Sequence, residues 1–263
     1  MRSTVPWLVL VAAAAILFLY GHDQAAAEFE RAQEMWLAGE YRPATRVYEK
    51  IRRHYPGSRY AAEALWEIAS VYYSHHYDLT EARARLEELL SLYPASPRVD
   101  EAILRLAEIH EAGEADLPAA VSYWSQALDR GLPPEDRREI LYKRGRALLK
   151  LEQLDESERD LRAAAGDAAD HLSQQAHVCL GTIAQIRGDH REAVRLFERS
   201  QELGRCGECL LQCRLSMIES FEYTGELDKA IGIAGVLDKT GYPKAVELIG
   251  RLRQKRDFYA DKN

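Results

Sequence analysis

The chain has 263 residues, 47% hydrophobic and 29% charged, which suits one or two ordinary domains or one extended repeat array. Its 42 acidic residues outnumber the 35 basic ones and give a formal charge of −7. A general nucleic-acid binder normally carries a basic surplus or stripe, so this balance argues against that class of protein.

The N-terminal segment Val5–Tyr20 is almost wholly apolar and uncharged, and only Arg2 precedes it as a charge. As a helix it would span about 24 Å, short of the hydrocarbon core of about 30 Å. Residues 1–24 are therefore interpreted either as an uncleaved membrane anchor or as a signal peptide with Ala25-Ala26-Ala27 as its small-residue site. Cleavage after Ala27 would cut into the first predicted helix, which favours the anchor.

Charges around this segment predict its orientation. Arg2 lies before it, and Asp23, Glu28 and Glu30 follow it, so the N-terminus is expected inside and the bulk of the chain outside. The predicted location is the cytoplasmic (inner) membrane, single-pass with the folded region in the periplasm, or the periplasm itself after cleavage. The first cysteine of the chain is Cys179, so lipidation at the end of the apolar run is not expected.

The folded region begins with two predicted helices, Ala25–Ala38 and Pro43–His54, with Gly39 in the turn between them. In the second helix Ala44, Val47, Tyr48 and Ile51 recur at helical spacing and form one apolar face. The same pattern of two helices returns along the chain, and in the second copy Thr80 is expected to cap the helix that runs to Leu92. Lys244–Phe258 is polar on one side and is predicted to cap the array.

A small residue occupies the same place in six successive copies, with spacings of 38, 38, 37, 36 and 37 residues: Ala44, Ala82, Ala120, Ser157, Ala193 and Ala230. A fixed period in this range predicts an all-α helical solenoid. The predicted repeats are 25–57, 58–96, 97–133, 134–167, 168–205 and 206–240, followed by a capping helix and tail over 241–263. Glu152 and Ser157 replace small residues in repeat four, which makes it the most degenerate copy.

These positions resemble the tetratricopeptide repeat (TPR) family over about Ala25 to Thr240. The small residues that match are Gly145 and Gly181 in the first helices of repeats, and Ala44, Ala82, Ala120, Ala193 and Ala230 at the starts of second helices. The other matches are Tyr48, Trp124 and Phe197 in second helices, and Pro56 and Pro94 at repeat ends. The longer period and the Tyr-Pro-x-Ser junctions resemble the bacterial envelope subgroup of outer-membrane assembly lipoproteins and cell-division coordinators. The resemblance implies a right-handed solenoid of about six repeats, preceded here by the apolar N-terminal helix.

The resemblance also implies a concave groove, lined by the first helix of each repeat, that binds a segment of a partner protein. The groove positions are Phe29, Gln33, Glu67, Val71, His75, Arg105, Tyr142, Arg146, Lys150 and Gln185. Tyr142, Arg146 and Lys150 are four residues apart and share a helix face. Together with Arg105 they are interpreted either as a site for an acidic peptide or chain terminus or as a solvated helix face. The nearby aromatics Trp66 and Tyr73 are expected to pack between helices, and His75 and His76 to end one.

Four cysteines lie in the last third of the chain: Cys179, Cys206, Cys209 and Cys213. For an exported protein the even count favours disulfides, with Cys179 paired to Cys213 and Cys206 to Cys209. Reduced structural thiols, a metal site with Cys179 as the fourth thiolate, and redox catalysis remain as alternatives. Leu210 stands where a haem-attachment motif needs His, which excludes that motif.

No phosphate-binding Gly-rich loop, His-Glu-x-x-His or Gly-x-Ser-x-Gly motif occurs, so we expect no catalysis, cofactor, metal or small-molecule substrate. The sequence predicts a scaffold that binds proteins of the cell envelope and contacts the membrane through Val5–Tyr20. One alternative is a metal or redox module, built on the cysteine cluster, that serves a membrane cofactor complex. Another is a TPR arm of a cytosolic enzyme complex.

Overall fold

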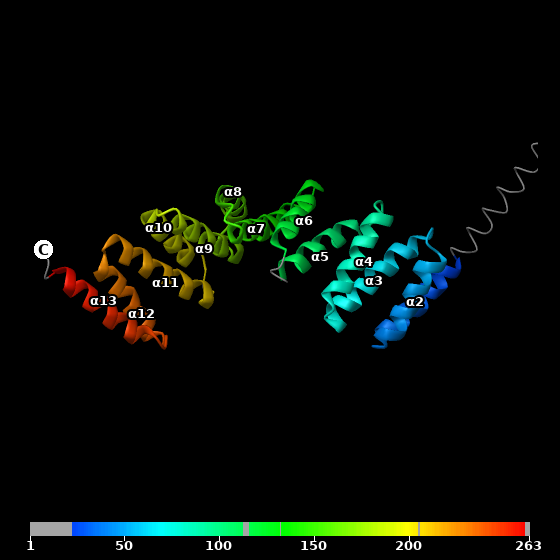
Figure 1. The fold of residues 1–263 in the computed structure, drawn as a ribbon, viewed down its shortest axis with the longest axis horizontal. Helices are drawn as coiled ribbons and strands as arrows, with labels where there is room; N and C mark the ends of the chain where they lie inside the picture. Colours follow the sequence, from blue (N-terminus) through cyan, green and yellow to red (C-terminus); the bar gives the residue numbers. More distant parts are fainter. Residues whose placement is uncertain (1–22, 113–115, 132, 205, 261–263) are drawn as a thin grey trace, which may run out of the picture. The chain divides into compact units, whose positions relative to one another are not determined.

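The structure is a computed structural model that describes residues 23–112, 116–131, 133–204 and 206–260. The predicted anchor Val5–Tyr20 lies outside these residues. Where the chain is described it is helical and contains no strand (Figure 1). A first helix covers residues 23–37. The others are α2 (Tyr41–His54), α3 (Arg59–Val71), the π-helix η1 (Tyr72–His76), α4 (Leu79–Leu92), α5 (Val99–Ala112), α6 (Leu117–Asp129), α7 (Pro134–Lys150), α8 (Leu154–Ala165), α9 (His171–Ile186), α10 (His190–Leu203), α11 (Gly207–Thr224), α12 (Leu227–Lys239) and α13 (Ala245–Ala260).

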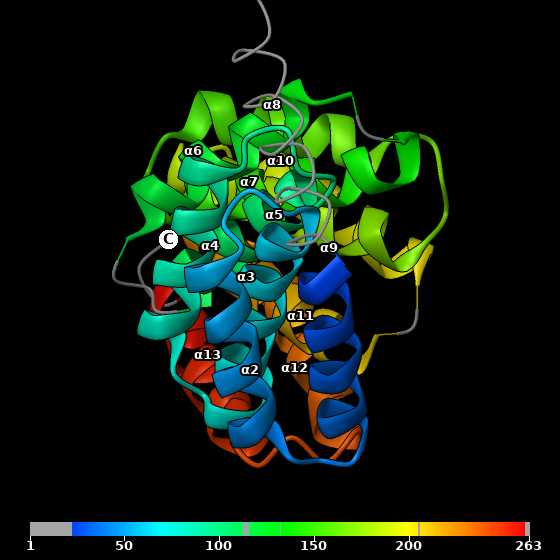
Figure 2. The same ribbon diagram turned by 90° about the vertical axis from the view of Figure 1, so that its right-hand side faces the viewer.

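The chain forms two compact units, one ending at Ala127 and the other beginning at Leu128. Helices adjacent in the sequence pack in pairs, α3 with α4 in the first unit and α7 with α8, α9 with α10 and α11 with α12 in the second, and each of these pairs is one repeat. We call the first helix of a pair helix A and the second helix B. Figure 2 shows the first such pair, the helix of residues 23–37 beside α2, whose apolar faces share the buried residues Phe29, Ala32, Ala44 and Tyr48. The all-α repeat architecture predicted from the sequence is confirmed.

The six periodic small residues are all buried completely, each near the start of a helix B. The amide of each donates to the carbonyl four residues earlier, in the first turn; the acceptors are Glu40, Asp78, Asp116, Gln153, Asp189 and Glu226. The repeat period therefore marks one structural position. Ser157 keeps it in the degenerate fourth repeat, where its hydroxyl donates to the Gly145 carbonyl at 2.7 Å.

Two glycines let helix A and helix B approach closely in repeats four and five. A Cβ placed on Gly181 would lie 2.4 Å from the Phe197 ring, and one on Gly145 would lie 2.9 Å from Leu161. Both distances are shorter than real Cβ contacts allow. These crossings explain why the repeat uses glycine inside helices that glycine otherwise destabilises.

Some helix boundaries differ from those expected. Thr80 was expected to cap α4, but Asp78 does so, because its carboxylate accepts from the Glu81 amide at 3.1 Å. Upstream of this cap, α3 continues as η1, and Tyr77 ends it with a left-handed backbone at φ 53°. His75 and His76 close this helix, which agrees with the expectation of a helix end.

Contacts between repeats involve charge as well as apolar packing. Arg138 on α7 reaches across repeat four to Asp170, with Nη1 and the carboxylate 2.8 Å apart, and its Nε donates to the Ala164 carbonyl. Asp170 also caps α9 by accepting from the Ser173 amide. The guanidinium of Arg138 and this amide hold the pKa of the Asp170 carboxyl well below its usual range.

Over the described residues, no helix combines the length and apolar character needed to cross a membrane.

Candidate partner-binding surfaces

In the first unit, two aromatic and two cationic side chains gather on neighbouring A helices. Trp66 on α3 and Tyr73 on η1 are seven residues apart. Arg98, which directly precedes α5, and Arg105, which lies within it, are also seven residues apart. The Arg105 guanidinium carbon is 4.3 Å from the Tyr73 ring centre and 5.8 Å from that of Trp66. Arg98 is 5.7 Å from the Trp66 ring centre. We call these four residues the aromatic–arginine surface; all four are partly exposed.

Acidic residues hold the arginines of this surface in place. Arg98 Nε lies 2.7 Å from Glu63 Oε2, and Arg105 Nε lies 3.5 Å from Glu108 Oε2. Burial raises the pKa of the nearby Glu67 carboxyl, and the positive charge of Arg98 opposes that rise. The arginines are therefore held both by ion pairs and by cation–π contacts with the aromatic rings.

Four more of the groove positions predicted from the sequence lie in the same unit. Phe29 and Val71 are buried, Phe29 against Tyr48 with ring centres 5.4 Å apart, so neither side chain is available to a partner. Gln33 and His75 are exposed, and His75 stacks on Tyr41 at 3.6 Å. The sequence predicts interhelical packing for Trp66 and Tyr73, and in the structure both are partly exposed. Their spacing of seven residues, matched by the two arginines, is the signal that could have revealed the surface.

The second unit contains the remaining predicted positions. Tyr142 is buried, which raises the pKa of its hydroxyl to about 12, and Arg146 lies 5.6 Å from its ring centre. Lys150 is exposed on the same helix. Gln185 instead joins two A helices, because its amide donates to the Ser216 carbonyl at 2.8 Å and to the Ser220 hydroxyl at 2.9 Å. Arg105 belongs to the first unit and these residues to the second.

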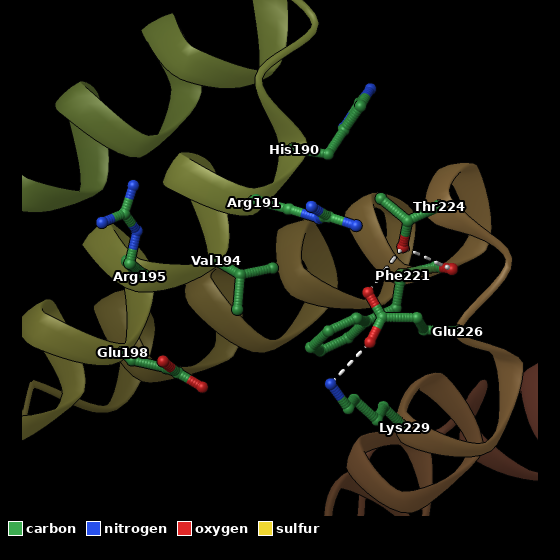
Figure 3. Close-up of a pocket in the computed structure, with 9 residues that line it drawn as sticks. All are labelled: His190, Arg191, Val194, Arg195, Glu198, Phe221, Thr224, Glu226 and Lys229. Carbon is green, nitrogen blue, oxygen red and sulfur yellow. Dashed lines mark hydrogen bonds and ion pairs between the residues drawn. The ribbon is translucent and has the colours of Figure 1, made fainter.

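Sequence reasoning did not identify a pocket of about 700 Å³ in the second unit (Figure 3). It is lined by α10, by the end of α11 and by the start of α12, and Val194 and Phe221 are the apolar residues of this lining. On the α12 side, Glu226 pairs with Lys229 at 2.5 Å and accepts from Thr224 at 3.2 Å. Arg191 and Arg195 line the pocket from α10. The pocket therefore opens beside helix B of repeat five, away from the positions predicted for the groove.

The cysteines occupy two different environments, and all four are free thiols in the structure. Cys206 Sγ and Cys209 Sγ lie 2.7 Å apart, and the Cys209 amide donates to Cys206 Sγ, the N-cap of α11. The hydrogen bond from Cys209 lowers the pKa of the Cys206 thiol, whereas burial raises that of Cys209 to about 12. Cys179 packs with Leu180 and Ile183, and Cys213 belongs to the cluster around Phe197. The pairing of Cys179 with Cys213 stays a prediction.

Comparison with known structures defines the class of the fold. The chain is similar to a tetratricopeptide repeat protein from Parabacteroides merdae ATCC 43184, with a TM-score of 0.60 at 17% identity over 89% of this chain and 87% of that one. It is equally similar, at TM-score 0.60 and 17% identity, to YrrB, described as a TPR protein with an unusual peptide-binding site, over 75% of this chain and 97% of that one. MamA from Desulfovibrio magneticus RS-1 gives a TM-score of 0.54 at 20% identity, over 69% of this chain and 95% of MamA. The fold is a TPR solenoid.

A family comparison adds a more specific likeness. Residues 22–122 match the model of the family described as YfiO, outer membrane lipoprotein. The match covers the first two repeats and most of the third, and it supports the resemblance to the bacterial envelope subgroup. No curated protein matches the sequence significantly.

Proposed function

We propose that this protein is a scaffold of the bacterial cell envelope that binds a segment of a partner protein on its A helices. The observation that carries the proposal is the aromatic–arginine surface on α3, η1 and α5. It lies within the part of the chain that matches the outer membrane lipoprotein family. TPR proteins generally bind partners through such arrays of A helices, and no catalytic motif in the sequence competes with that role.

The chemistry of the surface favours an extended segment with apolar and acidic side chains. Partly exposed aromatic rings offer large contact area at little cost in side-chain entropy, and the arginines offer N–H donors beside them. Trp, Tyr and Arg are the side chains that most often dominate binding energy at protein interfaces. A carboxylate of the partner would exchange with Glu108, whose contact to Arg105 is long at 3.5 Å.

The proposed location is the outer side of the cytoplasmic membrane, with Val5–Tyr20 as a single-pass anchor or, after cleavage behind Ala27, as a removed signal peptide. The apolar segment, the acidic residues that follow it and the envelope family match support this location.

Site-specific photo-cross-linking in intact cells tests the proposal. A photoreactive amino acid at position 73 should capture a defined envelope protein. The same residue at position 83, on helix B of the same repeat, should not. The capture, with the reactive residue at position 66, should fall at least about tenfold in Arg105→Ala, since a central arginine of an interface often contributes more than about 1.4 kcal/mol. Equal capture from positions 73 and 83, or none from 73, would contradict binding on the A helices.

A further inference from the structure

Three side chains that bind metals well converge at the starts of two A helices in the second unit. His171 is the first residue of α9, Cys206 is the N-cap of α11, and Cys209 lies in the first turn of α11. One ligand atom from each of the three lies within 4.8 Å of the other two. The sequence suggests Cys179 as the extra ligand of such a site, but the structure brings His171 to the pair.

We infer that His171, Cys206 and Cys209 form a zinc site that links repeats five and six. Imidazole nitrogen and thiolate sulfur are the ligands that tetrahedral zinc prefers, and two cysteines separated by two residues are a usual half of such a site. A water molecule completes the fourth position. The proposal does not depend on the partner-binding function.

The geometry requires only a small adjustment. With Zn–S near 2.3 Å and Zn–N near 2.0 Å, tetrahedral ligand atoms stand about 3.5–3.8 Å apart. The two sulfurs, now 2.7 Å apart, would open by about 1 Å. The imidazole nitrogen, which lies within 4.8 Å of both, would move inward by at most about 1.3 Å. His171 is exposed and begins its helix, so its ring can turn without disturbing packed neighbours.

The surroundings of Cys206 favour the thiolate that zinc requires, whereas the buried Cys209 gives up its proton only when its sulfur coordinates the metal. The Cys209 amide already donates to Cys206 Sγ, and the positive end of the α11 dipole stabilises negative charge at the same point. Binding releases the two thiol protons to solvent, and the histidine binds as the neutral ring. The bound group therefore carries no net charge. Since Cys209 is buried and His171 exposed, one side of the site is closed and the other open to solvent.

A disulfide between Cys206 and Cys209 is the competing use of the same thiols. A disulfide would not involve His171, whereas the zinc site requires it. Substitution of His171 therefore distinguishes the zinc site from the disulfide. A matched histidine lies on the same helix: His177, whose Nδ1 bonds the Ser173 carbonyl at 2.8 Å. A matched cysteine lies one turn along α11: Cys213, which is buried in the apolar cluster.

The test is titration of the reduced full-length chain with Zn²⁺ and, for spectroscopy, with Co²⁺. We expect one ion per chain, a tetrahedral cobalt spectrum with sulfur-to-metal charge transfer, and protection of two thiols from alkylation until a chelator is added. His171→Ala and Cys209→Ser should each weaken zinc affinity about a hundredfold or more, because each removes one of three protein ligands. His177→Ala and Cys213→Ser should leave it within about threefold.

Three outcomes would overturn the inference: no stoichiometric zinc in the reduced protein, unchanged affinity in His171→Ala, or a Cys206–Cys209 disulfide in protein isolated without reductant from cells supplied with zinc. Circular dichroism of each variant shows that it is folded, so that a loss of binding is assigned to the lost ligand.

Discussion

At the scale of single residues, the close crossing of helix A and helix B depends on the Cβ atom that glycine lacks. The α-hydrogen face of Gly181 meets the Phe197 ring, which is completely buried. Glycine inside a helix costs about 1 kcal/mol relative to alanine. The packing of Phe197 at the crossing of α9 and α10 must therefore stabilise the protein by more than this cost.

We predict that Gly181→Ala destabilises the protein, although alanine is the better helix former. The new methyl group would lie 2.4 Å from the ring, and relieving that overlap costs about 1–3 kcal/mol. Gly232→Ala on α12 is the matched control, because nothing lies within 4 Å of its added Cβ, and it should stabilise by up to about 1 kcal/mol. Urea unfolding measures both. Equal signs for the two variants would contradict the packing argument.

Side-chain roles were harder to predict than the positions of helices. Family register placed Phe29, Val71 and Gln185 on the groove face, yet the first two are buried and Gln185 bonds the next A helix. A helix turns by about 100° for each residue, so a small error in the facing angle moves a side chain from surface to core. The repeat period predicts where each helix lies in the sequence, but it does not predict the angle about its axis at which the helix packs.

At the scale of elements, five turns between helix A and helix B that the structure describes share one backbone conformation. Gly39, Gly188 and Gly225 each lie five residues before the buried small residue, with φ between 78° and 81°. Tyr77 and Glu152 stand at the same place in repeats two and four and adopt φ of 53° and 58°. The turn therefore keeps its left-handed residue even where the sequence supplies no glycine.

Glu152→Gly should stabilise the protein by about 0.5–1 kcal/mol. An L-residue in this region costs about 1–2 kcal/mol, part of which is offset by the greater freedom of glycine in the unfolded chain. Arg159→Gly, in the middle of α8 and also exposed, should destabilise by about 1 kcal/mol. Thermal and urea unfolding report both changes. A loss of stability in Glu152→Gly would show that this side chain contributes more than its backbone strain costs.

The sequence predicted where turns occur but not how α3 ends. Its periodicity continues through Tyr72, and nothing in the residue types announces the wider π-turn that follows. The turn brings His75 onto Tyr41 in repeat one, a contact that depends on how two repeats stack. Helix propensity is a property of one helix at a time, so it does not predict contacts that form when one repeat packs on the next.

At the scale of the whole molecule, the repeat period predicts more than the fold. Residues about one period apart occupy like positions on neighbouring A helices and therefore become neighbours in space. His171 and Cys206 are related in this way, as are Trp66 and Arg105. The aromatic–arginine surface and the histidine–cysteine cluster could both have been found by searching each chemically active residue one period along the chain.

In a repeat array each helix pair contacts mainly its neighbours, so damage at one end should stay local. Leu252 on α13 is completely buried in the cluster that also holds Ala234 and Leu237 of α12. Leu252→Ala should cost about 2–5 kcal/mol of local stability through the cavity it creates. Hydrogen exchange should then quicken in α12 and α13 while α2 to α4 keep their rates, and the exposed Arg253→Ala should change neither. Equal acceleration in all helices would instead mean that the two compact units unfold as one cooperative body, and the nearest-neighbour description would fail for this chain.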